Sequence, residues 1–370
     1  MVMYYLNDRG IKEAVKNGFI DFQPKLEDSQ IQPASIDLFF DGVEDYSQVM
    51  AVKEKPHGND SILYPGFSTD VAATQSVHLD GILSATVELR SSLRRLGCYR
   101  RVPSVMSAGL GHSGYESFRI GLDIVNPANI AIKLKKGDKI AQMLVMFDGP
   151  TEKELLNDNI YFIHDKTEYR KYLDLDHGME INETNEIKKL SARGYFSIFP
   201  AEKFRRGFLE VHAAERAFVL KDRVEVDLNA RKSLEDRLKE VSLPYKVKPG
   251  EFVMVDTMEK MDLSENIGIQ FYNAVASLTL RDFDRFSKSL ADSQLRGIYD
   301  GWVDPGYKGA FSRQPRTYYY NGVTIKKGDV LGYGRIIFFP NGVERSYGSK
   351  GLNSHYQNAE RTYVALRDEN

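Results

Sequence analysis

The chain has 370 residues, 42% of them hydrophobic, which is enough for two domains that each bury a core. Its formal net charge of −2 at pH 7 excludes a global basic field for nucleic acid, although locally gathered cations could still hold a small polyanion. Cys98 is the only cysteine, so an internal disulfide framework is excluded.

The N-terminal segment and the hydropathy pattern indicate a cytoplasmic protein. Residues 1–15 have neither the basic leader nor the apolar run of a signal peptide. No stretch approaches the roughly 20 apolar residues that a membrane helix needs. We therefore expect no membrane partner and, from the charge, no nucleic-acid partner.

Three helices are predicted in chain order. The first begins near Asn7 or Asp8, either of which can cap it, and ends at Asn17, before a glycine. The second covers 164–173. The third follows Asn229, where apolar residues recur at helical spacing: Leu234, Leu238 and Val241.

Most of the remaining sequence predicts short strands. β-branched and aromatic runs such as 130–134 and 335–339 are separated by glycine, proline and asparagine. The fold class is therefore mainly β, in a sandwich or barrel.

The chain also contains an internal duplication. Four short segments of the first half recur in the second half in the same order, at offsets between 184 and 192 residues; they start at Pro65, Ser92, Gly114 and Lys135, and recur at Pro249, Ser277, Gly306 and Lys326. The repeated Lys-Lys-Gly-Asp predicts a tight turn between two strands. We predict two domains, 1–165 and 190–370, joined by a polar linker at 166–189.

The segment from Arg90 to Gly97 is the strongest indication of function. Arg90, Ser91, Ser92 and Arg95 place hydroxyl groups between guanidinium groups, and both kinds of donor suit phosphate oxygens. A solvated turn is the structural alternative for such a charged run.

Four segments together resemble the dCTP deaminase/dUTPase family of trimeric nucleotide enzymes. They are 31–38, which reads Ile-Gln-Pro-Ala-Ser-Ile-Asp-Leu, the Arg90 segment, 301–309 around Asp-Pro-Gly-Tyr, and a tail around 354–357. The resemblance covers nearly the whole chain. It implies tandem dUTPase-like domains, each a distorted β-barrel or jelly roll, with a few short helices, and a homo-oligomer, most simply a trimer.

The resemblance also implies residue roles in the first half. Ser91 and Arg95 match catalytic positions of the family, and Arg90 and Ser92 match positions that hold the triphosphate. The family's general acid/base is a glutamate, and counting back from Gly137 places Asp123 there. Because aspartate is one methylene shorter, Asp123 could instead be an outward residue of an alternating strand.

In the second half, the resemblance implies a sugar-reading segment and a closing tail. Asp304 and Tyr307 match the residues that read the deoxyribose, whereas the first half has His112 in place of the aspartate. A plain β-turn is the alternative for Asp-Pro-Gly-Tyr. The tail residues expected at the nucleotide are Tyr347, Lys350, His355, Tyr356 and Gln357.

Each half retains what the other lacks, since the second half has apolar residues where Arg90 and Arg95 stand. We therefore expect composite sites, with phosphate and catalytic groups from the first half and sugar recognition from the second.

These matches predict hydrolytic deamination of dCTP to dUTP and ammonia. A single cysteine cannot supply the ligands of a zinc deaminase, so zinc is not expected, and Mg²⁺ would enter only with the triphosphate. The alternatives are a dUTPase, a bifunctional enzyme that releases dUMP, and a non-catalytic nucleotide-binding regulator.

Overall fold

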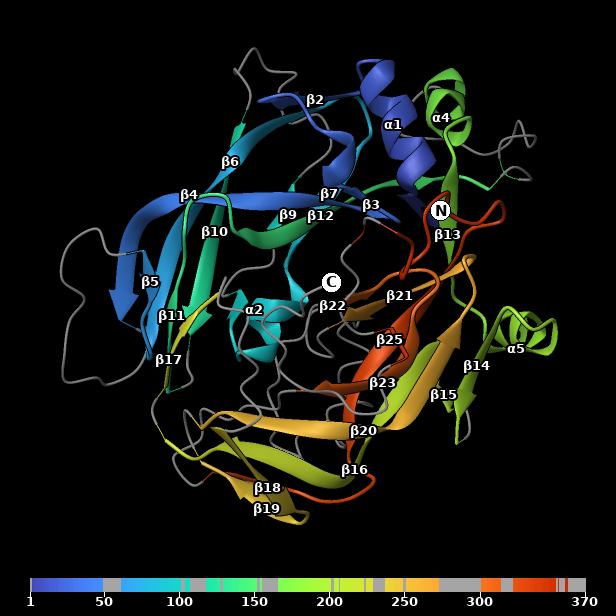
Figure 1. The fold of residues 1–370 in the computed structure, drawn as a ribbon. Helices are drawn as coiled ribbons and strands as arrows, with labels where there is room; N and C mark the ends of the chain where they lie inside the picture. Colours follow the sequence, from blue (N-terminus) through green and yellow to red (C-terminus); the bar gives the residue numbers. More distant parts are fainter. Residues whose placement is uncertain are drawn as a thin grey trace.

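The computed structural model describes residues 2–48, 61–100, 104–106, 118–126, 129–151, 154, 166–200, 203–205, 207–222, 224–228, 237–248, 251–272, 301–313, 322–350, 352 and 357–358. Two β-rich halves lie side by side (Figure 1). No helix in these residues is long and apolar enough to span a membrane.

The first half contains two helices, one short 3-10 helix and twelve strands in its described residues. In chain order they are β1 (Val2–Leu6), α1 (Asp8–Lys16), β2 (Ile20–Gln23), η1 (Asp28–Gln30), β3 (Ile31–Gln32), β4 (Ser35–Gln48), β5 (Ile62–Leu63), β6 (Phe67–Leu79), β7 (Ser84–Leu89), α2 (Ser91–Arg95), β8 (Tyr99–Arg100), β9 (Ser104–Met106), β10 (Phe118–Asn126), β11 (Ile130–Lys133) and β12 (Lys139–Gly149).

The rest of the described chain repeats this order after one additional helix. Its elements are α4 (Lys166–Leu173), β13 (His177–Ile181), α5 (Thr184–Ala192), β14 (Phe196–Phe199), β15 (Phe204–Arg205), β16 (Phe208–Leu220), β17 (Val224–Asp227), β18 (Leu238–Ser242), β19 (Tyr245–Val247), β20 (Val253–Leu263), β21 (Ile267–Tyr272), β22 (Gly301–Val303), β23 (Lys308–Arg313), β24 (Val323–Ile325) and β25 (Val330–Phe338).

Strand pairing shows that the two halves are copies of one fold. The long strand β4 pairs first with β12 and then, after a bulge, with β6, and β16 pairs in the same way with β25 and β20. The other pairs correspond in turn, for example β10 with β6 and β23 with β20, or β7 with β12 and β21 with β25. The predicted mainly β fold is confirmed.

The repeated Lys-Lys-Gly-Asp is a tight turn in both halves, as predicted. In the first, Asp138 N donates to Lys135 O at 2.9 Å, and Lys135 N donates to the Asp138 carboxylate at 2.8 Å. In the second, the same two bonds join Lys326 and Asp329. Gly137 and Gly328 have φ of +90° and +84°, which glycine adopts without strain.

The predicted linker, 166–189, contains regular structure. It holds α4, β13 and the start of α5, and β13 pairs with β1 of the first half and with β25 of the second. Because β13 pairs with β25 as β1 pairs with β12, β13 is the first strand of the second copy. The division into domains at 1–165 and 190–370 stays a proposal.

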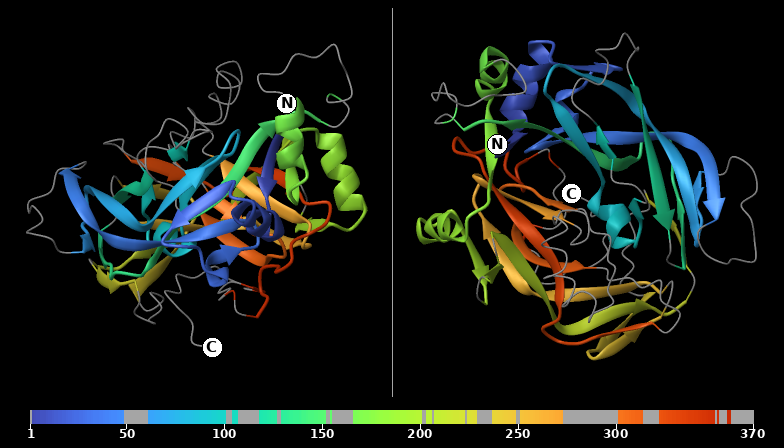
Figure 2. Two further views of the ribbon diagram at one scale, coloured as in Figure 1. Left: turned by 90° about the horizontal axis from the view of Figure 1, so that it is seen from above. Right: turned by 180° about the vertical axis from the view of Figure 1, so that it is seen from behind.

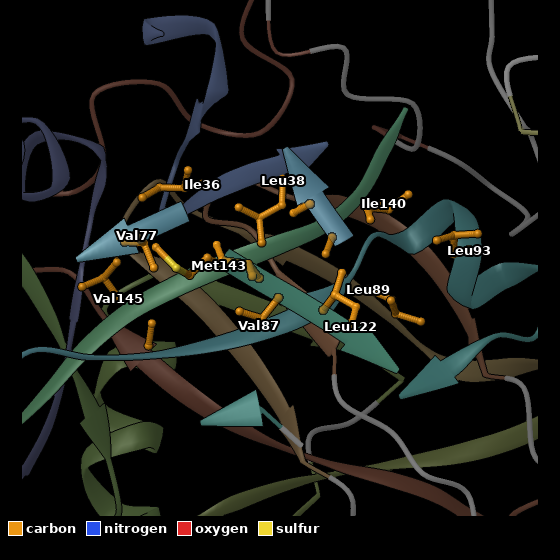
Figure 3. Close-up of a cluster of buried hydrophobic side chains, with 14 of the residues drawn as sticks. Ile36, Leu38, Val77, Val87, Leu89, Leu93, Leu122, Ile140, Met143 and Val145 are labelled. Carbon is orange, nitrogen blue, oxygen red and sulfur yellow. The ribbon is translucent and has the colours of Figure 1, made fainter. Parts of the chain in front are cut away.

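The halves share hydrophobic surfaces. The largest cluster is built on first-half residues such as Leu6, Ile36 and Phe147, yet it also includes Met254 of β20 and Phe252, which directly precedes that strand. Figure 3 shows part of this cluster, with Leu93 of α2 beside Ile140. Burial of one such side chain contributes about 1.5–3 kcal/mol, so the contacts that cross between halves are a substantial stabilising force.

A second cluster lies directly at the junction. Tyr5 and Met146 of the first half pack with Ile337 and Phe339 of the second, and Trp302 packs against the group. The Tyr5 and Trp302 rings are stacked, with centroids 6.1 Å apart. The two further views in Figure 2 show the halves meeting along this side. Trp302 is therefore held in place from the first half.

Candidate functional site

Helix α2 presents the Arg90 segment. Its side chains Leu93 and Leu96 are buried on one side of the helix. The helix is short because Gly97, with φ of +95°, ends it. Arg90 is its N-cap residue, and the Arg90 N–H donates to Ile140 O of β12 at 3.0 Å. Ser91 is exposed, whereas Ser92 and Arg95 are partly buried. The sheet below thus fixes where these side chains stand.

Arg90 is the centre of a charged cluster. Its Nη1 lies 2.8 Å from Oδ1 of Asp37 and 3.3 Å from Oε1 of Gln142. Lys139 Nζ lies 2.8 Å from the other Asp37 oxygen. The Asp37 side chain is fully buried and that of Arg90 is 19% exposed, so the carboxylate orients Arg90 from below.

Asp304 joins this cluster from the second half. Burial raises its pKa to about 6, while the positive charge of Arg90 and a hydrogen bond from Trp302 act in the opposite direction. Trp302 Nε1 donates to Asp304 Oδ1 at 2.8 Å. The negative charge of Asp37 raises the same pKa. Asp304 directly follows β22, which lies against β7, so it stands at the junction of the two halves and is influenced by charges of the first half.

Asp304 stands on a β-turn that also serves the site. Pro305 and Gly306 occupy its middle, Gly306 has φ +87°, and Tyr307 N donates to Asp304 O at 3.2 Å. A Cβ on Gly306 would lie 2.7 Å from Cβ of Ser346, so glycine is required here by both conformation and space. The same segment therefore forms a β-turn and contributes Asp304 to the candidate site.

Tyr307 and the tail close around this turn. Tyr307 is buried, its hydroxyl donates to Ala310 O, and its ring packs edge-on to Tyr347 at 5.5 Å. Gln357 Nε2 donates to Gly306 O at 2.9 Å, and its Oε1 accepts from Lys308 N at 3.0 Å. Lys350 is exposed. The tail is thus tied to the Asp304 turn by Gln357.

Some predicted residues are placed elsewhere or lie outside the described residues. Asp123 is on β10, on the opposite face from the buried Leu122 and Ile124, with Asp70 of β6 as its register partner. Asp123 is partly buried and its Oδ1 atom is shielded from solvent, and its catalytic role stays a prediction. His355 and Tyr356 lie outside the described residues, as does His112.

The second half has a different charged cluster at the corresponding place. The spacing from Gly328 to Tyr333 is the same as that from Gly137 to Gln142. Tyr333 is the register partner of Glu210, just as Gln142 is the register partner of Asp37. Glu210 is 3.6 Å from His212 Nε2, and Glu259 is 2.8 Å from His212 Nδ1. These two carboxylates raise the His212 pKa to about 9. His212, two residues after Glu210 on β16, is thus buried between two carboxylates of the second half.

Sequence reasoning missed the supporting residues. Asp37 lies in the quoted segment 31–38 but had been given no role, and Gln142, Lys139 and Trp302 had not been singled out. Strand register unites the first three, since Asp37 and Gln142 are direct partners of β4 and β12. Trp302 could have been suspected from its position two residues before Asp304.

Comparisons with known proteins agree with this geometry. A family model described as dCTP deaminase-like matches residues 5–147. A protein named "dCTP deaminase, dUMP-forming" from Sulfurihydrogenibium sp. (strain YO3AOP1) is 30% identical over 153 residues, 38% of this chain and 81% of that protein. A protein of the same name from Methanosphaera stadtmanae is 31% identical over 173 residues, 41% of this chain and 83% of that protein.

A solved structure extends the likeness to both halves. The 2′-deoxycytidine 5′-triphosphate deaminase of Agrobacterium tumefaciens matches with a TM-score of 0.63 at 14% identity, over 91% of this chain and 99% of that chain. At this identity the match establishes a shared fold. The sequence relatives cover about two fifths of this chain, whereas this structure has the duplicated architecture.

Proposed function

This chain belongs to the dCTP deaminase-like family, and from that premise we propose that it hydrolyses dCTP to dUTP and ammonia. The observation that carries the proposal is that Asp304 of the second half, next to a strand that lies against β7, is under the charges of Arg90 and Asp37 of the first half. An arginine and a carboxylate at one junction suit a ligand that carries phosphate at one end and a sugar hydroxyl nearby.

Each group has a proposed task. Arg90 and Ser92 bind triphosphate oxygens, and the Asp304 carboxylate accepts the hydrogen bond of the sugar 3′-hydroxyl. The buried Tyr307 and the tail residues Tyr347, Lys350, His355, Tyr356 and Gln357 form the wall that closes over the nucleotide. Because Gln357 is already bonded to the Asp304 turn, we assign it the task of holding the tail in place.

The chemistry requires a proton carrier. Water adds to C4 of cytosine while one of its protons passes to N3; the bond from C4 to the exocyclic amine then breaks, C4=O forms, and the remaining hydroxyl proton leaves with ammonia. We propose that Asp123 carries this proton, that Ser91 positions the water, and that Arg95 stabilises the negative charge that develops. Mg²⁺ would accompany the triphosphate and be bound through its oxygens.

The assembly and location follow from the same premise. We propose a homo-oligomer, with a trimer as the simplest closed form, that acts in the cytoplasm and takes dCTP as its small-molecule partner. The proposal includes no zinc.

A bifunctional reaction is the second candidate. The relatives from Sulfurihydrogenibium and Methanosphaera are both named as dUMP-forming. If this chain shares that property, a second water attacks the α-phosphorus of the dUTP, and dUMP and pyrophosphate leave. A nucleotide-binding regulator is the remaining alternative.

The test is a product analysis. The purified protein is incubated with Mg²⁺ and, separately, dCTP, dUTP and CTP, and products are resolved by ion exchange beside an ammonia assay. We expect dUTP and ammonia from dCTP and no product from CTP. Formation of dUMP and pyrophosphate would support the bifunctional candidate. Binding without any product would overturn the enzyme proposal in favour of a regulator.

Asp123→Asn tests the proposed proton carrier. An amide cannot take the proton from water, so we expect ammonia release to fall by about 100-fold or more while dCTP still binds. Asp70→Asn is the matched control, because Asp70 is the register partner of Asp123 on β6 and should be dispensable for turnover. Full activity of Asp123→Asn would remove Asp123 from the mechanism.

A further inference from the structure

A buried carboxylate lies beneath α2 and is not used by the chemistry proposed above. Glu88 is on β7, two residues before Arg90, and its side chain is 2% exposed. Its register partner on β12 is Gln142, which is also the register partner of Asp37 on β4. Asp37, Gln142 and Glu88 therefore form one row across three neighbouring strands, on the side of the sheet that carries Arg90.

Gln270 of the second half reaches this row. Gln270 of β21 is buried, and its Nε2 donates a hydrogen bond to Oε1 of Glu88. Strand β22 also lies against β7, so the two halves are in direct contact here. The other Glu88 oxygen lies 3.5 Å from Nη2 of Arg94 on α2. Glu88 thus links α2 to a strand of the other half.

Helix α2 needs such external support. It has five residues, and a helix this short is not stable by itself in water. Leu93 packs into the hydrophobic cluster on the apolar side of α2, and the contact between Glu88 and Arg94 holds its polar side. A buried carboxylate is costly unless hydrogen-bond donors satisfy it, so the Gln270 amide helps to hold Glu88 in place.

We propose that Glu88 and Gln270 are positioning residues: Gln270 of the second half holds Glu88, and Glu88 holds α2 so that Ser91 and Arg95 face the nucleotide. This inference rests on the proposed function for its kinetic consequence only. Its structural consequence, an α2 fixed from the second half, can be measured in the absence of turnover.

The first test is amide hydrogen exchange in Gln270→Leu and Glu88→Gln. The amides to follow are those of Arg94, Leu96, Gly97 and Cys98, all hydrogen-bonded within α2 and its C-terminal turn. We expect faster exchange there in both variants, with unchanged exchange in α1. Thr257→Val is the control, because it removes a buried hydrogen bond of the second half, to Glu259 O, that does not involve α2.

The second test is a kinetic comparison with an exchanged pair. Misplaced catalytic groups can cost about 100-fold in rate, so we expect kcat for dCTP to fall about 10–100-fold in each single variant, with a smaller change in KM. In Glu88→Gln/Gln270→Glu the donor and acceptor are exchanged and the hydrogen bond is restored. We expect this double variant to exchange more slowly in α2, and to turn over faster, than either single variant.

The outcomes are separable from those of the proposed function. A wild-type protein without ammonia release would refute the proposed reaction, and the exchange data would still decide this inference. Unchanged exchange of the α2 amides in Gln270→Leu would overturn the inference. So would a double variant no better than the single variants, or faster exchange throughout the molecule including α1.

Discussion

At the scale of single residues, Asp304 of the second half is influenced by the charge of Arg90 in the first half. Its folded-state pKa of about 6 lies above the ordinary 3.8 because burial outweighs the attraction of Arg90. Since the folded pKa is raised, the contribution of Asp304 to stability is fully present below about pH 4 and is lost as the pH rises through about 6. The proposed binding of the sugar 3′-hydroxyl requires the opposite protonation state, because only the ionised Asp304 carboxylate acts solely as a hydrogen-bond acceptor.

The pH dependence of substrate binding tests this requirement. We expect KM for dCTP to rise as the pH falls below about 6, and Asp304→Asn to lack this rise. At pH 8 the variant should have a KM raised by about 10-fold or more, since a hydrogen bond to a charged group contributes about 1.5–3 kcal/mol. The ratio of variant to wild-type KM is the quantity to measure, because titration of the triphosphate cancels in it.

Asp262→Asn is the control for this series. Asp262 is an exposed aspartate of the same half, paired with Lys308 at 2.8 Å, and its loss should leave the pH profile of KM unchanged. A wild-type KM that is constant from pH 5 to pH 8 would contradict the role of Asp304.

Residues could be selected from the sequence where they stand in a motif. Arg90 and Asp304 were selected in this way, the charge of Arg90 acts on Asp304 in the structure, and the roles of both residues stay predictions. Asp37, Glu88 and Gln270 were beyond its reach, because their significance depends on strand register and on contacts up to 182 residues apart. The sequence does not show which neighbouring residue a polar side chain within a strand will contact.

At the scale of elements, α1 shows how a local signal and a distant contact combine. Asn7 caps the helix as predicted, accepting from Gly10 N at 2.9 Å. The same helix end binds the second half: Asp8 accepts from the N–H groups of Glu344 and Arg345, each at 2.9 Å. The cap could be read from sequence, whereas the binding of residues 344–345 could not.

Gly10 is the position at which this junction is tightest. A Cβ there would lie 1.9 Å from the carbonyl oxygen of Asp176, so Gly10→Ala must displace backbone. We expect a loss of about 1–3 kcal/mol in the free energy of unfolding, despite the better helix propensity of alanine. Urea-induced unfolding measures it.

Gly42→Ala is the control, because the space around Gly42 is open. It should change the free energy of unfolding by no more than about 0.5 kcal/mol. Equal effects of the two substitutions would show that the close contact between α1 and Asp176 is absent in solution.

Prediction of the elements failed where tertiary pairing prevailed over local pattern. The helix expected after Asn229 is wrong in its described part, because 238–242 is the strand β18, paired with β16. Leu238 and Val241 have helical spacing, yet their segment pairs with the strand β16 of the neighbouring sheet instead of forming a helix. The helix expected at 164–173 is present as α4 over Lys166–Leu173.

At the scale of the whole molecule, the two copies of one fold carry different polar residues. Both copies keep the Lys-Lys-Gly-Asp turn and the pairing of the long strand with two partners, so the fold tolerates large changes in its polar residues. In the first copy, Asp37 is paired with Arg90 and Lys139. In the second, Glu210 and Glu259 lie beside the buried His212. The order of the repeats could be predicted from sequence, but the contacts of these polar residues required the register.

The central claim is that one nucleotide is held by both halves of one chain. The most direct measurement is a crystal structure of the protein with dCTP and Mg²⁺. We expect the phosphates at Arg90 and Ser92, and the sugar 3′-hydroxyl within about 3.2 Å of the Asp304 carboxylate of the same chain. A bound nucleotide whose phosphates avoid the Arg90 segment, or whose sugar lies away from Asp304, would contradict the account.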